Sequence, residues 1–166
     1  MEGAPVSAAE RARRIRVLGL RDVIVVLGSA ALLVLDARLR SDGASGPAPL
    51  VVAVLAGALL TLSGFYAHEW GHYLAARWAG AAPTPAASPW SVFLFEIGES
   101  ECSREQWLWM SAGGYAASML GLAVIFGVID LSVTSGRVAA ILTSLGVLAT
   151  FVLEIPITVR VYRTRR

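Results

Sequence analysis

Residues 50–78 read LVVAVLAGALLTLSGFYAHEWGHYLAARW, an apolar run with two histidines and a glutamate near its carboxyl end. A bilayer core of about 30 Å is crossed by about 20 apolar residues in a helix, so this run is long enough to span a membrane. Placing an ionisable side chain in hydrocarbon costs free energy, so such a residue within a span suggests a functional site. The run therefore predicts both a transmembrane helix and a chemical site on it.

The composition of the whole chain is typical of an integral membrane protein. Of its 166 residues, 56% are hydrophobic and 16% are charged, whereas a soluble domain usually has about 25% charged residues. The net charge of +2 is small and scattered, so we expect the lipid bilayer and no nucleic acid as a partner. Cys102 is the one cysteine, which excludes an intrachain disulfide.

Four apolar stretches predict an all-α polytopic protein with about four transmembrane helices in one transmembrane domain, residues 1–166. The spans cover about 17–35, 50–78, 106–129 and 138–159. The first span has an arginine-rich start and a short apolar run, a pattern that is also typical of a signal peptide. No convincing small-residue cleavage site follows it, which favours a retained helix.

The placement of arginines predicts the orientation, because cytoplasmic loops carry an excess of basic residues. Four spans put both termini and the 79–105 loop on one side of the membrane. The other side holds Arg38, Arg40 and Arg137, which leaves eleven of the fourteen arginines on the first side. We expect both termini and the 79–105 loop to be cytoplasmic, in a multi-pass protein of a bacterial-type inner membrane.

The 79–105 loop is proline-rich up to Pro89. It then contains the run SVFLFEI, residues 91–97, which is rich in β-branched and aromatic residues. This run predicts a short strand or hairpin that re-enters the membrane; a surface segment anchored by Trp90 is the alternative. A strand edge can hold an extended peptide by main-chain hydrogen bonds. The candidate substrate-binding residues are Val92, Phe93, Leu94 and Phe95.

Both histidines of the chain lie in His68-Glu69-Trp70-Gly71-His72. Helix positions i and i+4 share one face, so both imidazoles can reach one zinc ion. Glu69, beside them, is the candidate catalytic base. The alternative is a pair of core histidines bonded to neighbouring helices, with Glu69 paired to Arg77.

A catalytic zinc usually has three protein ligands and an open position. His72 lies six residues before Trp78, and Glu154 lies six residues before Arg160, so both lie about 9 Å from the cytoplasmic ends of their spans. Equal depth favours Glu154 as the third ligand, and Pro156 would allow a local break in its helix. A buried carboxylic acid with no metal is the alternative. With zinc, the predicted reaction is amide hydrolysis in which Glu69 moves the proton of the attacking water.

The motif at 68–72 resembles that of the site-2 protease family of intramembrane zinc metalloproteases. Residues 111–118, SAGGYAAS, are similar to that family's small-residue segment, which usually reads Ala-Gly-Pro-x-Ala-Asn, with Ser118 in place of the asparagine. The resemblance covers about residues 55–160. It implies a zinc metalloendopeptidase that cleaves a transmembrane segment of another membrane protein near the cytoplasmic face.

One motif departs from the family. The later motif of the site-2 protease family carries Asn, Pro and then Leu-Asp-Gly, and its aspartate is the third metal ligand. The matching residues of this chain, 151–160, read FVLEIPITVR and contain no aspartate. Either Glu154 substitutes for it, or the chain is a catalytically inactive relative that binds or regulates membrane proteins. A structural four-helix protein whose histidines bind nothing is a third hypothesis.

Small residues in the third span predict close helix packing. Gly113, Ala117 and Gly121 recur at i, i+4 and i+8, and this spacing lets helix backbones approach in lipid. We expect the third span to pack on the histidine helix. The seam of a homodimer is the competing explanation.

Overall fold

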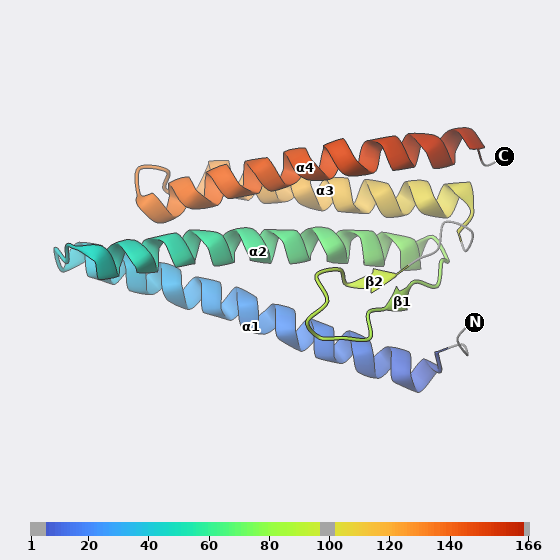
Figure 1. Cartoon of the computed structure of the whole chain (residues 1–166), viewed down its shortest axis with the longest axis horizontal. Helices are drawn as coiled ribbons and strands as arrows, with labels where there is room; N and C mark the ends of the chain where they lie inside the picture. The colour runs from blue at the N-terminus through green and yellow to red at the C-terminus, as the bar shows by residue number, and fades with distance from the viewer. Residues whose placement is uncertain (1–5, 97–101, 165–166) are drawn as a thin grey trace.

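The computed structural model describes residues 6–96 and 102–164. In this part of the chain four long helices are present, and they run back and forth along one axis (Figure 1). Each is long and apolar enough to cross a membrane, which confirms the predicted all-α class and makes the chain a multi-pass membrane protein. The helices are α1 (Ala8–Ser41), α2 (Pro47–Trp78), α3 (Arg104–Val128) and α4 (Thr134–Thr164).

Helices α1 and α3 begin before the predicted spans because capping groups satisfy their first N–H groups. The Ser7 hydroxyl accepts the Glu10 N–H at 3.2 Å, so α1 begins well before residue 17. Ser103 and Gln106 form a reciprocal capping box. Residues 104 and 105, which were predicted to lie in the loop, are therefore helical. Helix α2 ends at Trp78, as predicted.

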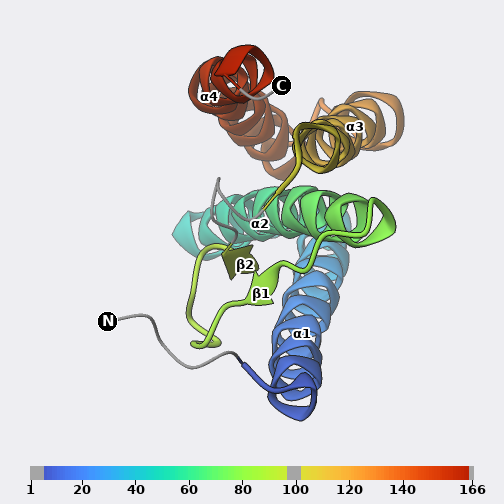
Figure 2. The ribbon, with the colours of Figure 1, turned by 90° about the vertical axis from the view of Figure 1, so that its right-hand side faces the viewer.

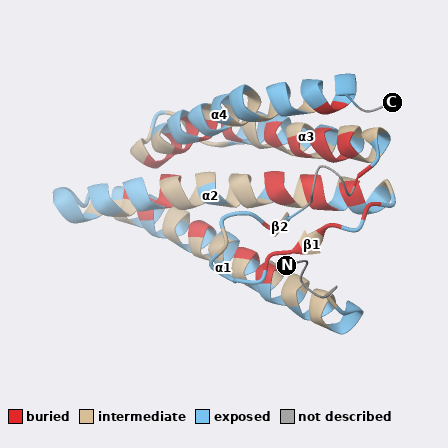
Figure 3. Ribbon diagram, turned by 45° about the vertical axis from the view of Figure 1, so that its right-hand side comes forward, coloured by how far each residue is buried: buried red, intermediate tan, exposed pale blue. Residues whose placement is uncertain are grey.

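Helix α2 is the central element of the bundle. Viewed along the helix axes, it lies between α1 on one side and the pair α3 and α4 on the other (Figure 2). Buried residues occur in both halves of α2, and in its carboxyl-terminal half the connecting segment lies between α2 and the diverging α1 (Figure 3). His68, Glu69 and His72 lie in the carboxyl-terminal half and are buried. The fold therefore buries the polar motif and exposes apolar side chains outward.

The contact between α2 and α3 has glycine on both sides. A Cβ on Gly71 would lie 2.5 Å from the carbonyl oxygen of Gly113 and 2.9 Å from the Cβ of Ala117. Only glycine allows the two backbones to approach this closely. This confirms α3 as the packing partner of the histidine helix. Gly121 takes no part in the contact, since an added Cβ there would meet no atom within 4 Å.

The segment between α2 and α3 contains a short antiparallel hairpin, β1 (Thr84–Pro85) with β2 (Phe95–Glu96). The prediction of a strand over residues 91–97 is wrong for residues 91–94. Two of the backbone groups there bind side chains: the Ser91 carbonyl accepts from Arg21, and the Leu94 N–H donates to Glu69. Ile97 lies outside the described residues.

The start of α1, the end of α4 and the hairpin lie at the same end of the bundle (Figure 1). Helix α4 continues through Pro156 without interruption. At the opposite end, Asp130 accepts from the backbone N–H and hydroxyl of Ser132, at 2.9 and 2.7 Å, in the turn before α4. These hydrogen bonds hold the pKa of Asp130 below its usual range.

Replacing Gly71 with alanine should destabilise the bundle, because the new methyl group collides with the backbone of α3. We expect the free energy of unfolding to fall by about 1–3 kcal/mol. Circular dichroism during thermal unfolding in detergent measures the effect. Gly127→Ala is the matched control in α3, since its added Cβ meets nothing within 4 Å. Equal midpoints for the two variants would contradict the close contact.

Candidate metal centre

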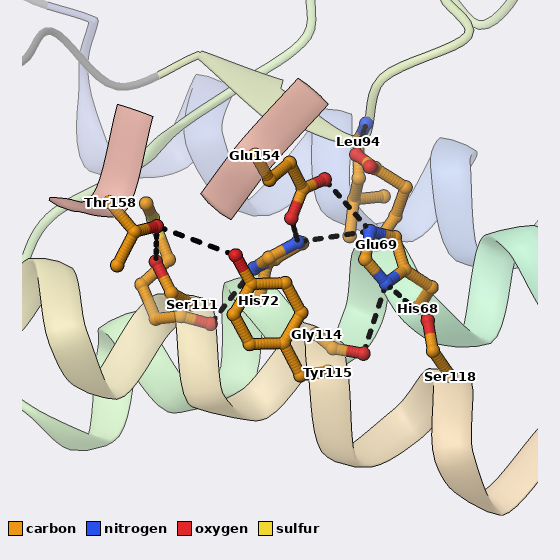
Figure 4. Close-up of polar contacts among 11 residues, drawn as sticks. His68, Glu69, His72, Leu94, Ser111, Gly114, Tyr115, Ser118, Glu154 and Thr158 are labelled. Carbon is orange, nitrogen blue, oxygen red and sulfur yellow. Dashed lines mark hydrogen bonds and ion pairs between the residues drawn. The ribbon is translucent and has the colours of Figure 1, made fainter. Parts of the chain in front are cut away.

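His68 and His72 point from one face of α2 toward the space between α3 and α4 (Figure 4). The two residues are 4% and 8% exposed, and their Nε2 atoms are 3.0 Å apart. His68 Nδ1 lies 3.0 Å from the Gly114 carbonyl oxygen, and His72 Nδ1 lies 2.8 Å from that of Met110. A carbonyl oxygen can only accept, so each Nδ1 donates its hydrogen. In the neutral ring the Nε2 lone pair is then free to bind a metal.

Helix α3 orients both rings through its small-residue segment. A Cβ on Gly114 would collide with the ring of His72, so only glycine fits at this position. The Ser118 hydroxyl lies 2.9 Å from His68 Nδ1 and accepts from it as well. Hydrogen bonds of this kind on the far nitrogen fix the tautomer and orientation of metal-ligating histidines. The sequence alone did not identify these carbonyl groups as partners.

Glu154 reaches the same point from α4. Its Oε1 lies 3.3 Å from His68 Nε2, and its Oε2 lies 3.3 Å from His72 Nε2. The structure therefore brings together the two histidines that spacing selected and the glutamate that depth selected. Glu154 lies on a helix that is continuous despite Pro156. The role of Glu154 as a metal ligand stays a prediction.

The donor set fits a zinc ion in both chemistry and size. Two Nε2 lone pairs and a carboxylate are all acceptors, and such groups converge favourably only around a cation or shared protons. Tetrahedral ligands at about 2.0–2.1 Å from zinc lie about 3.3–3.4 Å from one another. The observed separations of 3.0 to 3.3 Å agree with that geometry. Two histidines and a glutamate are also an established ligand set of catalytic zinc.

The Glu69 carboxylate is turned toward the connecting segment (Figure 4). Its Oε2 accepts the backbone N–H of Leu94 at 3.0 Å, and the residue is 6% exposed. This partner differs from Arg77, the alternative that the sequence suggested. The contact was not foreseeable from the motif, because Leu94 lies 25 residues away in the chain.

Trp70, inside the motif, connects α2 to α1. Its indole N–H donates to Asp22 at 2.8 Å, and Arg21 donates to the other oxygen of Asp22 at 2.7 Å. The same Arg21 donates to the carbonyls of Pro89 and Ser91, at 3.0 and 2.6 Å. This network holds the segment that contacts Glu69 against α1 and α2. A charged pair within an otherwise apolar span is the sequence signal that could have identified it.

The candidate substrate-binding residues differ in their exposure. Val92 and Phe93 are each 62% exposed, whereas Leu94 is 1% exposed and belongs to the core. The Leu94 carbonyl also accepts the Ala86 N–H at 3.0 Å. Phe95 is partly buried and packs near Tyr73, with ring centroids 5.9 Å apart. The role of these four residues in binding substrate stays a prediction.

A second polar group connects α3 and α4 beside Glu154. Thr158 lies one helical turn from Glu154, and its hydroxyl is 3.1 Å from that of Ser111 and 3.5 Å from that of Tyr115 (Figure 4). The Tyr115 ring packs against Phe151 with centroids 5.3 Å apart. These contacts fix the height of Glu154 relative to the histidines, and the sequence did not indicate them.

No family model, curated protein or solved structure matches the chain. The resemblance to the site-2 proteases therefore rests on the motif residues themselves, and membership of that family stays a prediction.

Glu154→Gln should strongly reduce zinc content while leaving the fold intact, because it removes the charge and keeps the shape. We expect about one zinc per chain in the wild-type protein, measured by elemental analysis after purification in detergent. Glu105→Gln, an exposed residue in the first turn of α3, is the matched control and should keep its zinc. Full zinc occupancy in Glu154→Gln would remove Glu154 from the ligand set.

Proposed function

We propose that this chain is a zinc-dependent intramembrane metalloprotease of the site-2 type. It would hydrolyse a peptide bond in or near a transmembrane segment of another membrane protein. The observation that carries the proposal is the convergence of His68 Nε2, His72 Nε2 and the Glu154 carboxylate, with both Nδ1 atoms bonded to carbonyls. If the histidines served only to join helices, nothing would favour bringing three hydrogen-bond acceptors, the two Nε2 atoms and the carboxylate, to one point.

Zinc held by these residues would supply a water of lowered pKa, near ~7, and would polarise the carbonyl of the scissile amide. Glu69 follows directly after a ligand and has a buried carboxylate. The Leu94 N–H fixes this carboxylate through Oε2. We assign to Oε1 the removal of the proton from the attacking water, and Glu69 then returns that proton to the leaving nitrogen.

A catalytically inactive relative is the second candidate. The contact of Glu69 with Leu94 favours it, because the connecting segment covers the proposed base. The absence of the family's aspartate points the same way. Both candidates keep the metal and differ only in whether Glu69 moves a proton, so a substitution of Glu69 separates them.

Glu69→Gln should abolish cleavage and retain zinc, because the amide keeps the shape of the side chain and cannot take a proton. The loss of a general base typically lowers the rate 10²–10⁴-fold, so we expect about that loss. A panel of end-tagged single-span membrane proteins, reconstituted with the enzyme in vesicles, provides the cleavage assay. Cleavage by wild type that stops with a zinc chelator and resumes with added zinc supports the enzyme. Equal cleavage by Glu69→Gln and wild type would reject it.

The proposal includes a location in a bacterial-type inner membrane with both termini in the cytoplasm. The start of α1 and the end of α4 lie at one end of the bundle, which supports a shared side for the two termini. That end carries most of the arginines, and the positive-inside rule places such an end in the cytoplasm.

A fluorescent protein fused after Arg166 should fluoresce in cells, whereas alkaline phosphatase fused there should be inactive. Both results follow from a cytoplasmic carboxyl terminus, because these reporters fold on opposite sides of the membrane. The same two reporters inserted after Gly43, in the turn between α1 and α2, should give the reverse pattern. Active phosphatase at the carboxyl terminus would invert the proposed orientation.

A further inference from the structure

A small cavity lies beside His68 where α2, α3 and α4 meet. Its volume is about 60 Å³, and its wall includes one glycine from each of the three helices: Gly64, Gly121 and Gly146. We call it the glycine pocket. It extends from the candidate metal centre toward the α3–α4 turn, since Gly64 lies one helical turn from His68 on that side.

These three glycines do not serve close helix packing. An added Cβ at Gly64, Gly121 or Gly146 would meet no atom within 4 Å, in contrast to Gly71, where it would meet backbone at 2.5 Å. Glycine in a helix interior costs roughly 1 kcal/mol relative to alanine. At three positions, therefore, the wall of this cavity is built without side-chain atoms.

The wall of the pocket suits an aliphatic group. The Thr61 hydroxyl donates to the Gly57 carbonyl at 3.1 Å and lies 3.2 Å from the Thr143 hydroxyl, so these polar groups already have partners. The ring of Phe65 and the side chain of Val147 supply apolar surface. A water molecule needs two to four polar partners to be held in a cavity. An aliphatic group needs none.

The size of the pocket limits what enters it. A dry apolar cavity of about 150 Å³ accommodates benzene, so a cavity of about 60 Å³ has room for only a few carbon atoms. Side chains of the size of alanine or valine fit this volume, whereas aromatic rings do not.

The pocket is reached from the lipid-facing surface. A larger apolar groove of about 500 Å³ runs along α2 and α3, and it shares Gly64, Gly121 and Thr143 with the glycine pocket. Leu74 and Leu120, which line this groove, are exposed on the outside of the bundle. A segment embedded in the bilayer can therefore approach His68 without crossing water.

We propose that the glycine pocket is the subsite that receives a small aliphatic side chain of the substrate, next to the scissile bond. The proposal rests on the proposed function, because His68 forms both the pocket wall and part of the metal centre. It defines the substrate class as a membrane-embedded segment with a residue of alanine to valine size at the cleavage site.

Hydroxamic acids test the pocket without a known substrate, because the hydroxamate binds zinc and its acyl group extends into the neighbouring space. The probes are acetohydroxamic, isobutyrohydroxamic and benzohydroxamic acid, titrated by calorimetry into the zinc-loaded full chain in detergent. Burial of two extra carbons should make the isobutyro compound bind about tenfold tighter than the aceto compound. The benzo compound should bind more weakly than the isobutyro compound, because its ring exceeds the pocket.

Gly146→Leu fills the pocket, and the ratio of the aceto to the isobutyro dissociation constant should fall from about ten to about one. Gly127→Leu is the matched control: it also has open space around its Cβ, lies outside the pocket wall, and should keep the tenfold ratio. Gly121→Val is a second filling variant, and zinc content confirms that each protein is intact. The wild-type series tests the pocket even if a variant does not fold.

The outcomes separate this proposal from the proposed function. Equal affinity of wild type for all three compounds, with zinc present and membrane proteins cleaved, overturns the pocket alone. The predicted preference without any cleavage supports the pocket and counts against the protease. Failure of every compound to bind, acetohydroxamic acid included, overturns the metal centre and the pocket together.

Discussion

The close approach of α2 and α3 at Gly71 and Gly113 is the contact on which the candidate site depends. Because no side chain separates the two backbones there, the carbonyls of Met110 and Gly114 come within hydrogen-bond distance of His72 and His68. These bonds set the tautomer of both rings and point both Nε2 atoms at α4. A wider separation of α2 and α3 would leave two buried imidazoles without partners, which is costly in an apolar interior.

Several buried polar groups of the bundle pair across helices, which lowers the cost of placing them in hydrocarbon. Asp22 binds Trp70 and Arg21, and at the other end of α1 Asp36 accepts from the Ser135 hydroxyl at 2.7 Å. These contacts attach α1 to α2 and α4 at two heights. The Glu154 carboxylate differs from these groups because both of its oxygens face histidine nitrogens. This difference supports a cation there more strongly than the motif does.

The candidate site has two contrasting sides. On one side the connecting segment covers Glu69 with a backbone N–H and is itself held by Arg21. On the other side the glycine pocket leaves open space next to His68 and opens toward the lipid-facing groove. In the proposed function a membrane-embedded peptide approaches through the groove, while Glu69 stays buried beneath the connecting segment. Proton transfer by Glu69 would then take place away from lipid.

The sequence by itself determined the helical class, the approximate spans and the histidine pair, because these follow from run length and helix periodicity. It also selected Glu154, since a fixed rise per residue converts position in a span into depth. Ser91 to Leu94 and Gly121 were interpreted wrongly, as strand and as packing surface, because their surroundings come from distant parts of the chain. Only the tertiary structure decided that Leu94 covers Glu69, that α3 carbonyls orient the histidines, and that Gly121 lines a cavity. Local patterns specify which residues share a helix face, whereas the partners of that face depend on how closely the helices approach.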